Sequence, residues 1–301
     1  MCLKIGYFAD GQWAHLAFEK LITDRTISIS FICVRYDKRD EQLIKYAQTY
    51  DIPVLIHQNV NSEQFINEIR KYDADLFVSM SFNQIFKEEI RNIPRLKSIN
   101  CHAGKLPFYR GRNILNWVLI NDENEFGITV HYIDDGIDTG DIILQRTYPI
   151  SDNDNYSTLL QKAYIGCAEI LYDAIKLIQN DQAVRIEQDK IDNIGTYFGM
   201  RKENDEIIDW NQSSREIFNF VRAISKPGPQ ATSYIGDKKI FINKANLIDK
   251  AHEYRCIVGQ VIGKTESGFL VKTKDTFVEI VEYSYDGKIK IGDRLNRGED
   301  R

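Results

Sequence analysis

The sequence is poor in cysteine, in net positive charge and in long apolar runs. Its 301 residues include five scattered cysteines with no CxxC pair, which favours free thiols over a disulfide or zinc framework. No run approaches the ~18 apolar residues of a membrane span. The N-terminal stretch MCLKIGYFADGQW has no apolar segment typical of a signal peptide. We therefore expect a cytoplasmic protein without membrane contact.

Further absences concern ligands. The net charge of −5 does not favour a polyanionic partner, although it is compatible with a local basic patch. The five histidines show no metal-ligand spacing such as HExxH, so we expect no metal site. A GxGxxG fingerprint is also absent near the first predicted strand, so dinucleotide binding is not implied.

The first 180 residues show an alternation of strand and helix patterns. Strands are predicted at 3–9, 26–34, 52–57, 74–81, 96–102, 126–133 and 141–150. Helices are predicted at 13–22, 40–50, 62–72, 83–93 and 156–179. This alternation predicts βαβ units and a mostly parallel sheet, in which ligands bind beyond the carboxyl ends of the strands.

The remaining residues predict a second unit. Ser213 and Glu216 form a capping box ahead of an amphipathic helix, and the short strands that follow, with Gly and Asp turns, are typical of a small β-barrel. We therefore predict an α/β domain over residues 1–180, a linker over 181–205 and a C-terminal OB-like β-barrel domain over 206–301.

The stretch INCHAGKLPFYRGRNILNW, residues 99–117, carries the most specific chemistry. Asn100 and His102 lie two apart at a predicted strand end, so they share one face while Cys101 faces the other way. An amide can donate to a developing oxyanion, and an imidazole can move a proton near neutral pH. A carboxylate to orient the imidazole is available among Asp134, Asp135, Asp138 and Asp141. From these residues alone, a purely structural histidine remains an alternative.

The segment SINCHAGKLPFYRGRNILNWVLINDENEFGITVHYIDDGIDTGDII resembles the core of the N10-formyltetrahydrofolate-dependent formyltransferases. The family hallmark is Asn-x-His, a Leu-Pro-x-x-x-Gly loop and a downstream Asp-x-Gly turn. These correspond here to Asn100 and His102, to Leu106–Gly111, and to Asp138–Gly140. The resemblance implies acyl transfer in which Asn100 binds the oxyanion, His102 stabilises the intermediate and shuttles the amine proton, and Asp138 pairs with His102.

The resemblance extends over nearly the whole chain. TYFGMRKENDEIIDWNQSSREIFNFVRAISKPGPQATSYIGDKKIFI is similar to the C-terminal region of methionyl-tRNA formyltransferases and of the UDP-aminoarabinose formyltransferases. A Rossmann-like formyltransferase domain followed by an OB-like barrel is therefore implied, with N10-formyltetrahydrofolate as co-substrate and no metal. The residues that would bind the folate are Ser81, Phe82, Asp134, Asp135 and Gly136.

The acceptor amine does not follow from the fold, but three features favour a nucleotide-linked amino sugar. The loop VRYDKRDEQLIKYAQ is short, and Lys38 and Arg39 stand between aspartates, whereas methionyl-tRNA formyltransferases carry a longer basic insertion there. Residues 206–301 have a net charge of only +2, against −7 for residues 1–205. YRGRNILNW resembles the UDP-aminoarabinose enzyme, and Arg112 could bind a nucleotide diphosphate bidentately.

We therefore predict formyl transfer to the C4 amino group of a UDP- or dTDP-linked amino-deoxy sugar. The residues expected to bind the acceptor are Tyr109, Arg110, Gly111, Arg112 and Asn116. One alternative is methionyl-tRNA formyltransferase. Another is a single-stranded nucleic-acid binder with a relic catalytic domain, which the intact Asn100, His102 and Asp138 and the lack of basic-aromatic interleaving disfavour. Nucleic acid is not the expected partner, and a homodimer through the barrel edge is compatible with the sequence.

Overall fold

The computed structural model describes residues 2–298, and the chain divides into two compact units. The first holds residues up to Arg112 together with 126–148 and 161–198. The second holds 113–125, 149–160 and the chain from Gly199 onward. Each unit is therefore assembled from separate pieces of sequence, and most of the segment 181–205 belongs to the first unit.

A seven-stranded sheet forms the centre of the first unit, in the order β3-β2-β1-β4-β5-β7-β8. Its strands are β1 (Leu3–Ala9), β2 (Ile27–Val34), β3 (Val54–Ile56), β4 (Leu76–Met80), β5 (Ser98–His102), β7 (Glu125–Tyr132) and β8 (Ile142–Pro149). The strands β1 to β5 are parallel, and β7 is antiparallel to β5. The predicted Rossmann-like α/β architecture is confirmed.

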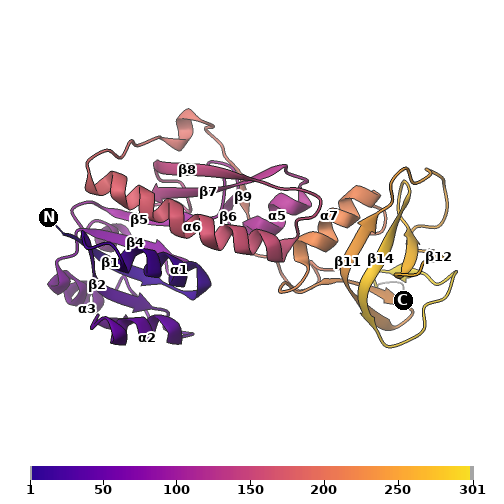
Figure 1. Ribbon diagram of the computed structural model, residues 1–301, viewed down its shortest axis with the longest axis horizontal. Coiled ribbons are helices and arrows are strands. Elements are labelled where there is room, and N and C mark those ends of the chain that lie inside the picture. Colours follow the sequence, from indigo (N-terminus) through magenta and orange to yellow (C-terminus); the bar gives the residue numbers. More distant parts are fainter. Residues whose placement is uncertain (1, 299–301) are drawn as a thin grey trace. The chain divides into compact units, whose positions relative to one another are not determined.

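Helices cover both faces of this sheet (Figure 1). The helices are α1 (Gly11–Ile22), α2 (Glu41–Thr49), α3 (Glu63–Ile69), α4 (Glu88–Arg91) and α6 (Tyr156–Gln179). Successive residues of β1 show the two faces, because Tyr7 donates to the carbonyl of Ala14 in α1 whereas Phe8 packs against Phe65 of α3. Helix α6 lies on the α1 side, where Tyr164 meets Trp13.

The predicted helix over 83–93 is largely wrong, because only the four residues of α4 are helical. Gln84 explains the difference. Its Oε1 accepts from the backbone N–H of Val60 and its Nε2 donates to the carbonyl of His57, so the chain before α4 is held as a loop. The loop still buries Phe86 against the aromatic core beneath α3.

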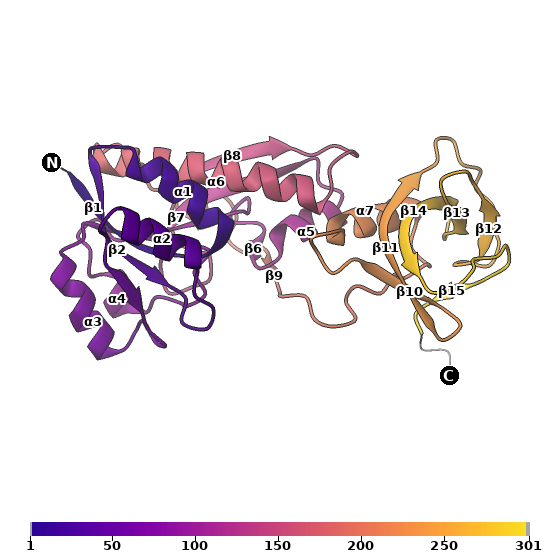
Figure 2. The same ribbon diagram turned by 60° about the horizontal axis from the view of Figure 1, so that its bottom comes forward.

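The second unit is built on a six-stranded antiparallel sheet in the order β12-β13-β14-β11-β10-β15. Its strands are β10 (Ala231–Ile235), β11 (Lys238–Leu247), β12 (Val261–Lys264), β13 (Phe269–Lys272), β14 (Phe277–Tyr285) and β15 (Leu295–Asn296). Backbone hydrogen bonds between residues 259–261 and 292–295 draw the two edges together, and the sheet curls as a barrel does (Figure 2). The predicted C-terminal β unit is confirmed.

Two helices, α5 (Ile114–Ile120) and α7 (Ser214–Ile224), complete the second unit. The predicted capping box opens α7, since the Ser213 side chain accepts from Glu216 N and the Glu216 side chain accepts from Ser213 N. Helix α5 does not follow from our sequence patterns. No helix within the described part of the chain is both long and apolar enough to cross a bilayer.

Candidate active site

Strand β5 presents Asn100 and His102 on one face of the sheet. Cys101 faces the other way, as predicted, and its Sγ contacts the carbonyl of Cys167 in α6 at 3.8 Å. In the neighbouring strand β7, His131 lies directly opposite Asn100. Opposite residues of an antiparallel pair point to the same face. The site face therefore carries two imidazoles and an amide, on the side of the sheet away from α6.

The loop between β7 and β8 brings Asp138 to both imidazoles. Asp138 Oδ2 lies 3.6 Å from Nδ1 of His102, and Oδ1 lies 3.5 Å from Nε2 of His131. Gly111 N donates to Oδ2 at 2.9 Å. Burial raises the pKa of Asp138, but His102, His131 and the Gly111 N–H outweigh it and hold that pKa well below its ordinary value. The carboxylate is therefore ionised at neutral pH.

Backbone carbonyls fix one proton on each imidazole. His102 Nε2 lies 2.8 Å from the oxygen of Tyr109, and His131 Nδ1 lies 2.9 Å from the oxygen of Tyr132. A carbonyl oxygen only accepts, so both of these nitrogens carry hydrogen. The second nitrogen of each ring faces Asp138. A second proton on either ring therefore points at the carboxylate.

Asn100 is tied to the second histidine. Its Nδ2 lies 3.3 Å from Nε2 of His131 and donates to that nitrogen when it is unprotonated. An amide nitrogen carries two hydrogens, so one remains for a ligand oxygen. Our sequence interpretation did not assign a role to His131. The available signal was its position in a predicted strand, but the register that sets it opposite Asn100 is a tertiary feature.

Gly104 confines the ring of His102. A Cβ at this position would lie 2.4 Å from His102 Nε2 and 2.4 Å from the oxygen of Tyr109. A side chain there would collide with both partners of the bond that fixes the tautomer. Tyr109 itself has φ 58° and Asp138 has φ 56°. Aspartate tolerates this left-handed region, but a tyrosine rarely adopts it, so the surrounding contacts hold Tyr109 there.

The loop that follows β5 is clamped by the segment before residue 199. The two-residue strand β6 (Arg110–Gly111) pairs with β9 (Tyr197–Phe198). The Tyr109 ring stacks on Phe198 with centroids 4.9 Å apart. Gly111 has φ 100°, and a Cβ there would lie 2.3 Å from the oxygen of Phe198. Glycine is therefore required both for this close approach and for the left-handed backbone that points its N–H at Asp138.

The remaining predicted acceptor residues differ in accessibility. Arg110 is buried, and its guanidinium bonds Gln188, the carbonyl of Ile194 and the hydroxyl of Tyr197. Asn116 lies in the second unit, where it is buried and its Nδ2 donates to the carbonyl of Ala223 at 2.6 Å. Arg112 is exposed, and its side chain forms no ion pair with another residue in the described ranges.

The predicted folate residues lie in two loops of the first unit. Ser81 is exposed with φ 60°, and the Phe82 ring packs against Phe8 with centroids 5.6 Å apart. Asp134 Oδ1 accepts from Gly136 N and from the Thr139 hydroxyl and so closes the turn that leads to Asp138.

Asp135 is exposed, and Arg91 of α4 donates to it at 2.6 Å. The hydrogen bond from Arg91 lowers the pKa of Asp135. This ion pair ties the loop between β7 and β8 to α4, on the same side of the sheet as the imidazoles.

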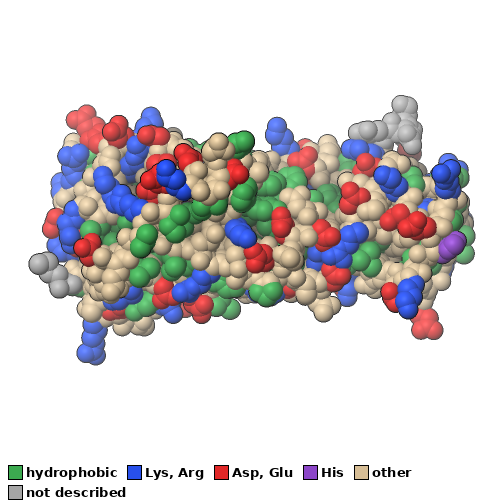
Figure 3. Space-filling model, turned by 90° about the horizontal axis from the view of Figure 1, so that it is seen from above, with side chains coloured by type: hydrophobic (Ala, Val, Ile, Leu, Met, Phe, Trp, Pro, Cys, Tyr) green, Lys and Arg blue, Asp and Glu red, His purple; other side chains and the backbone are tan. Residues whose placement is uncertain are grey.

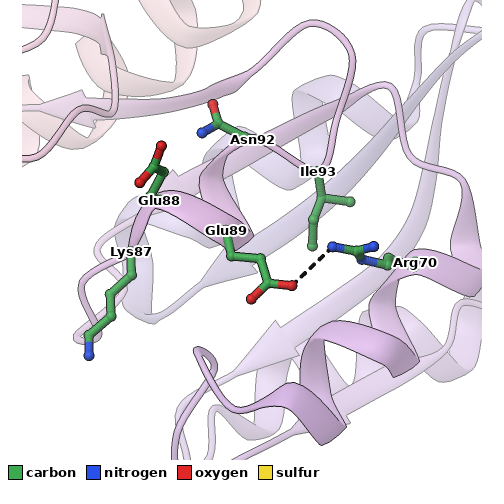
Figure 4. A pocket seen from close by; sticks show the side chains of 6 residues that line it. All are labelled: Arg70, Lys87, Glu88, Glu89, Asn92 and Ile93. Atoms are coloured by element: carbon green, nitrogen blue, oxygen red, sulfur yellow. Dashed lines mark hydrogen bonds and ion pairs between the residues drawn. The ribbon is translucent and has the colours of Figure 1, made fainter.

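A separate open groove lies between the 3₁₀ turn η1 (Arg70–Tyr72) and α4 (Figure 4). It is lined by Arg70, Lys87, Glu88, Glu89, Asn92 and Ile93. Arg70 and Glu89 pair across it at 3.1 Å. The six lining side chains include no imidazole, hydroxyl or thiol, and Glu89 is already paired with Arg70. No group of three or more His, Cys, Asp or Glu side chains within residues 2–298 is arranged to hold a metal ion.

A Rossmann-like sheet with an amide and two imidazoles on one face, and a largely buried carboxylate brought to them by a loop, is typical of an α/β enzyme. Residues 8–175 match the formyl transferase family, and residues 201–296 match the formyl transferase C-terminal domain. The chain belongs to the formyl transferase family and is a formyltransferase.

Two relatives and one solved structure illustrate the range of that family. The chain is 37% identical over 250 residues to the bifunctional polymyxin resistance protein ArnA of Wigglesworthia glossinidia brevipalpis. The matched region covers 81% of this chain but only 38% of ArnA. It is 32% identical over 297 residues to the methionyl-tRNA formyltransferase of Geobacter sulfurreducens, covering 96% and 91% of the two chains.

The solved structure is the N-formyltransferase of Helicobacter canadensis in complex with folinic acid and dTDP-3-aminofucose. It resembles this chain with a TM-score of 0.67 at 24% identity, over 94% of this chain and all of that one. A likeness at this level of identity shows the shared fold.

Proposed function

We propose that the protein transfers the formyl group of N10-formyltetrahydrofolate to the amino group of a nucleotide-linked amino sugar. The cluster of Asn100, His102 and Asp138 on one face of the sheet carries this proposal. The match to the family supports the formyl donor. The dTDP-3-aminofucose of the Helicobacter complex, and the resemblance of YRGRNILNW to the UDP-aminoarabinose enzyme, support the sugar acceptor.

In the proposed mechanism the neutral acceptor amine attacks the formyl carbon, and the carbonyl oxygen becomes an oxyanion. Asn100 donates its second amide hydrogen to that oxygen. His102 donates its Nε2–H, which bonds the neutral carbonyl of Tyr109 in the unliganded protein, because a charged acceptor makes the stronger hydrogen bond.

Asp138 stabilises the positive charge on His102 when a second proton lies on Nδ1, 3.6 Å from Oδ2. The bond between the formyl carbon and N10 then breaks. The proton lost by the attacking amine ends on N10 of tetrahydrofolate, and the acceptor leaves as its N-formyl derivative. With a proton on Nδ1 facing Asp138, Nε2 of His102 gives its proton to N10 and takes the proton of the amine, so the imidazole ends as it began and no protein nucleophile is needed.

The region after β2 supports a sugar acceptor over a transfer RNA. Arg35 is paired with Asp10 at 3.1 Å and with Asp37 at 2.6 Å, so its charge is already balanced. The carboxylate of Asp40 lies at the N-terminus of α1, where its Oδ2 accepts a hydrogen bond from Gly11 N at 2.7 Å. A surface that binds RNA needs cationic side chains to contact the phosphates. On the face in Figure 3, which is seen from above the view of Figure 1, acidic and basic side chains are interspersed.

Arg112 is the candidate for binding the diphosphate of the nucleotide. Its backbone N–H donates to the carbonyl of Phe198 at 2.9 Å, which fixes the base of the side chain. Its guanidinium is exposed, and we find no carboxylate paired with it in the described chain. A planar guanidinium binds two phosphate oxygens at once. The resemblance to the UDP-aminoarabinose enzyme favours C4 as the position of the reactive amine.

Methionyl-tRNA formyl transfer is the second candidate function. The 32% identity over 91% of the Geobacter enzyme favours it. The two functions share the donor and the catalytic face and differ in the acceptor. The residues that contact the acceptor, rather than the residues of β5, must therefore decide between the two functions.

A competition assay tests the proposal. The purified protein receives N10-formyltetrahydrofolate with UDP- and dTDP-linked 3-amino and 4-amino sugars, and initiator methionyl-tRNA in parallel. Mass spectrometry detects the gain of one formyl group, and a His102→Ala variant is the control for enzymatic transfer. Formylated sugar with unmodified tRNA is the expected result. Formylated tRNA with unmodified sugars would refute the sugar acceptor and leave the catalytic cluster in place.

A further inference from the structure

We propose that Gln188 is a positioning residue that holds the Asp138 carboxylate against the imidazoles, an inference that rests on the proposed formyl transfer. Gln188 begins the 3₁₀ turn η2 (Gln188–Lys190), within the segment 181–205 that sequence patterns indicate to be a linker. It is only 2% exposed. A fully buried amide in an irregular segment requires partners for all its polar atoms.

The side chain of Gln188 joins the Asp138 turn to the strand β6. Its Nε2 donates to the carbonyl of Asp138 and to that of Gly140, both at 2.8 Å. Its Oε1 accepts from Arg110 Nη2 at 2.7 Å and from Nε at 3.1 Å. Both amide hydrogens and both lone pairs of the amide oxygen are therefore used.

The chemistry of the partners determines which way this amide faces. A guanidinium only donates and a backbone carbonyl only accepts, so the oxygen must face Arg110 and the nitrogen must face the Asp138 turn. Exchanging the two ends would set donor against donor and acceptor against acceptor. Gln188 therefore links the buried guanidinium of Arg110 to the turn that carries the Asp138 carboxylate, and its amide can face only one way.

Two contacts together fix Asp138 relative to β6. Gly111 N holds the carboxylate at 2.9 Å, and Arg110, the preceding residue, holds the backbone of the turn through Gln188. Asp138 has φ 56°, a left-handed conformation that aspartate tolerates. Without the Gln188 bonds, β6 would hold Asp138 through the Gly111 N–H alone, and the turn could move away from the imidazoles.

Small movements matter at this position. The carboxylate lies 3.6 Å and 3.5 Å from the two ring nitrogens, at the outer limit of a hydrogen bond. A misplacement of about 1 Å by a residue outside the reacting groups can lower a rate by roughly 10²-fold. Gln188 therefore acts on the reaction through Asp138 and not by touching the substrate.

The substitution Gln188→Glu tests this role. It keeps the size of the side chain and gives Arg110 a charged acceptor, but it sets an oxygen without hydrogen against the carbonyls of Asp138 and Gly140. We expect kcat to fall about tenfold or more, with the KM for N10-formyltetrahydrofolate within about threefold of wild type. The matched control is Gln182→Glu, the same charge change at an exposed position, which should keep wild-type kcat.

A double-mutant cycle with Asp138→Asn separates positioning from general damage. If Gln188 acts through Asp138, Gln188→Glu changes kcat by less than about threefold once Asp138 is already substituted. Equal losses in both backgrounds, or no loss of kcat in the single variant, would overturn the inference. If the Gln188→Glu variant does not fold, Gln188→Asn, which keeps the amide on a shorter side chain, is tested in the same cycle.

The cycle is run with whichever acceptor the wild type formylates, so that the two proposals can fail separately. Activity only with tRNA refutes the sugar proposal alone. A wild type inactive with both acceptors refutes both proposals.

Discussion

Replacing Asp138 by asparagine removes one negative charge from the site and little else. The side chain keeps its size, and its oxygen can still accept from Gly111 N, which now holds Asp138 at 2.9 Å. With that oxygen in the place of Oδ2, the side chain still faces His102 Nδ1 but carries no negative charge, and the new amide group faces Nε2 of His131. The variant therefore tests the charge of Asp138 while preserving the turn.

The magnitude follows from the distance. A unit charge on His102 and the Asp138 carboxylate, 3.6 Å apart, attract by about 4–5 kcal/mol at an effective dielectric constant of about 20. Only the part that grows in the transition state accelerates the reaction. If about 3–4 kcal/mol of it does, kcat falls roughly 10²–10³-fold, because each 1.36 kcal/mol corresponds to about tenfold. The KM for the folate should change much less.

The assay is steady-state formyl transfer at saturating donor and acceptor, with thermal unfolding to verify the fold. Asp181→Asn is the matched control, because Asp181 is exposed and has φ 57°, nearly that of Asp138. We expect the control to retain wild-type kcat. A kcat for Asp138→Asn within fivefold of wild type would show that the carboxylate does not stabilise a charged imidazole during the reaction.

Further outcomes follow from the same geometry. Asn100→Ala should lower kcat roughly 10²–10³-fold, the usual effect of losing one oxyanion donor, and a near-normal kcat would contradict that role. Gly104→Ala should lower kcat at least tenfold, since its Cβ would meet His102 Nε2 at 2.4 Å, and a crystal structure would show a displaced ring. Arg112→Ala should raise the KM of the acceptor far more than that of the folate, and equal effects would exclude Arg112 from the nucleotide site. Because the pKa of Asp138 is depressed on folding, its stabilisation is present above about pH 4 and is lost as the pH falls toward the folded-state pKa. The difference in unfolding free energy between wild type and Asp138→Asn should therefore shrink in acid, as denaturant titrations between pH 3 and pH 7 would show.

The proposed catalytic residues and the residues considered for acceptor binding lie in different kinds of structure. Asn100 and His102, two of the proposed catalytic residues, lie on β5, and Asp138, the third, lies on the turn between β7 and β8. Arg35 and Arg112 lie in loops at the surface, and only the second is without a carboxylate partner in the described chain. Selection of the acceptor can therefore change through loops while the chemistry at β5 stays constant.

Sequence patterns were sufficient for the parallel sheet because buried strands and amphipathic helices leave strong local periodicities. The capping box at Ser213 and Glu216 was equally readable, since both partners lie within one turn. The prediction of a helix over 83–93 was largely wrong, because contacts between residues far apart in the sequence decided that segment. Gln84 bonds Val60 and His57, and these contacts outweigh the local helical periodicity.

The sequence by itself determined the α/β class, the curled C-terminal sheet and the residues Asn100, His102 and Asp138 as a candidate trio, because strand alternation and short motifs are local properties of the chain. Only the tertiary structure decided the rest of the site. His131 joins Asn100 through strand register, and Gln188 reaches Asp138 across 50 residues. Hydrogen bonds of this kind depend on where the backbone finally lies, and no spacing along the chain encodes that position.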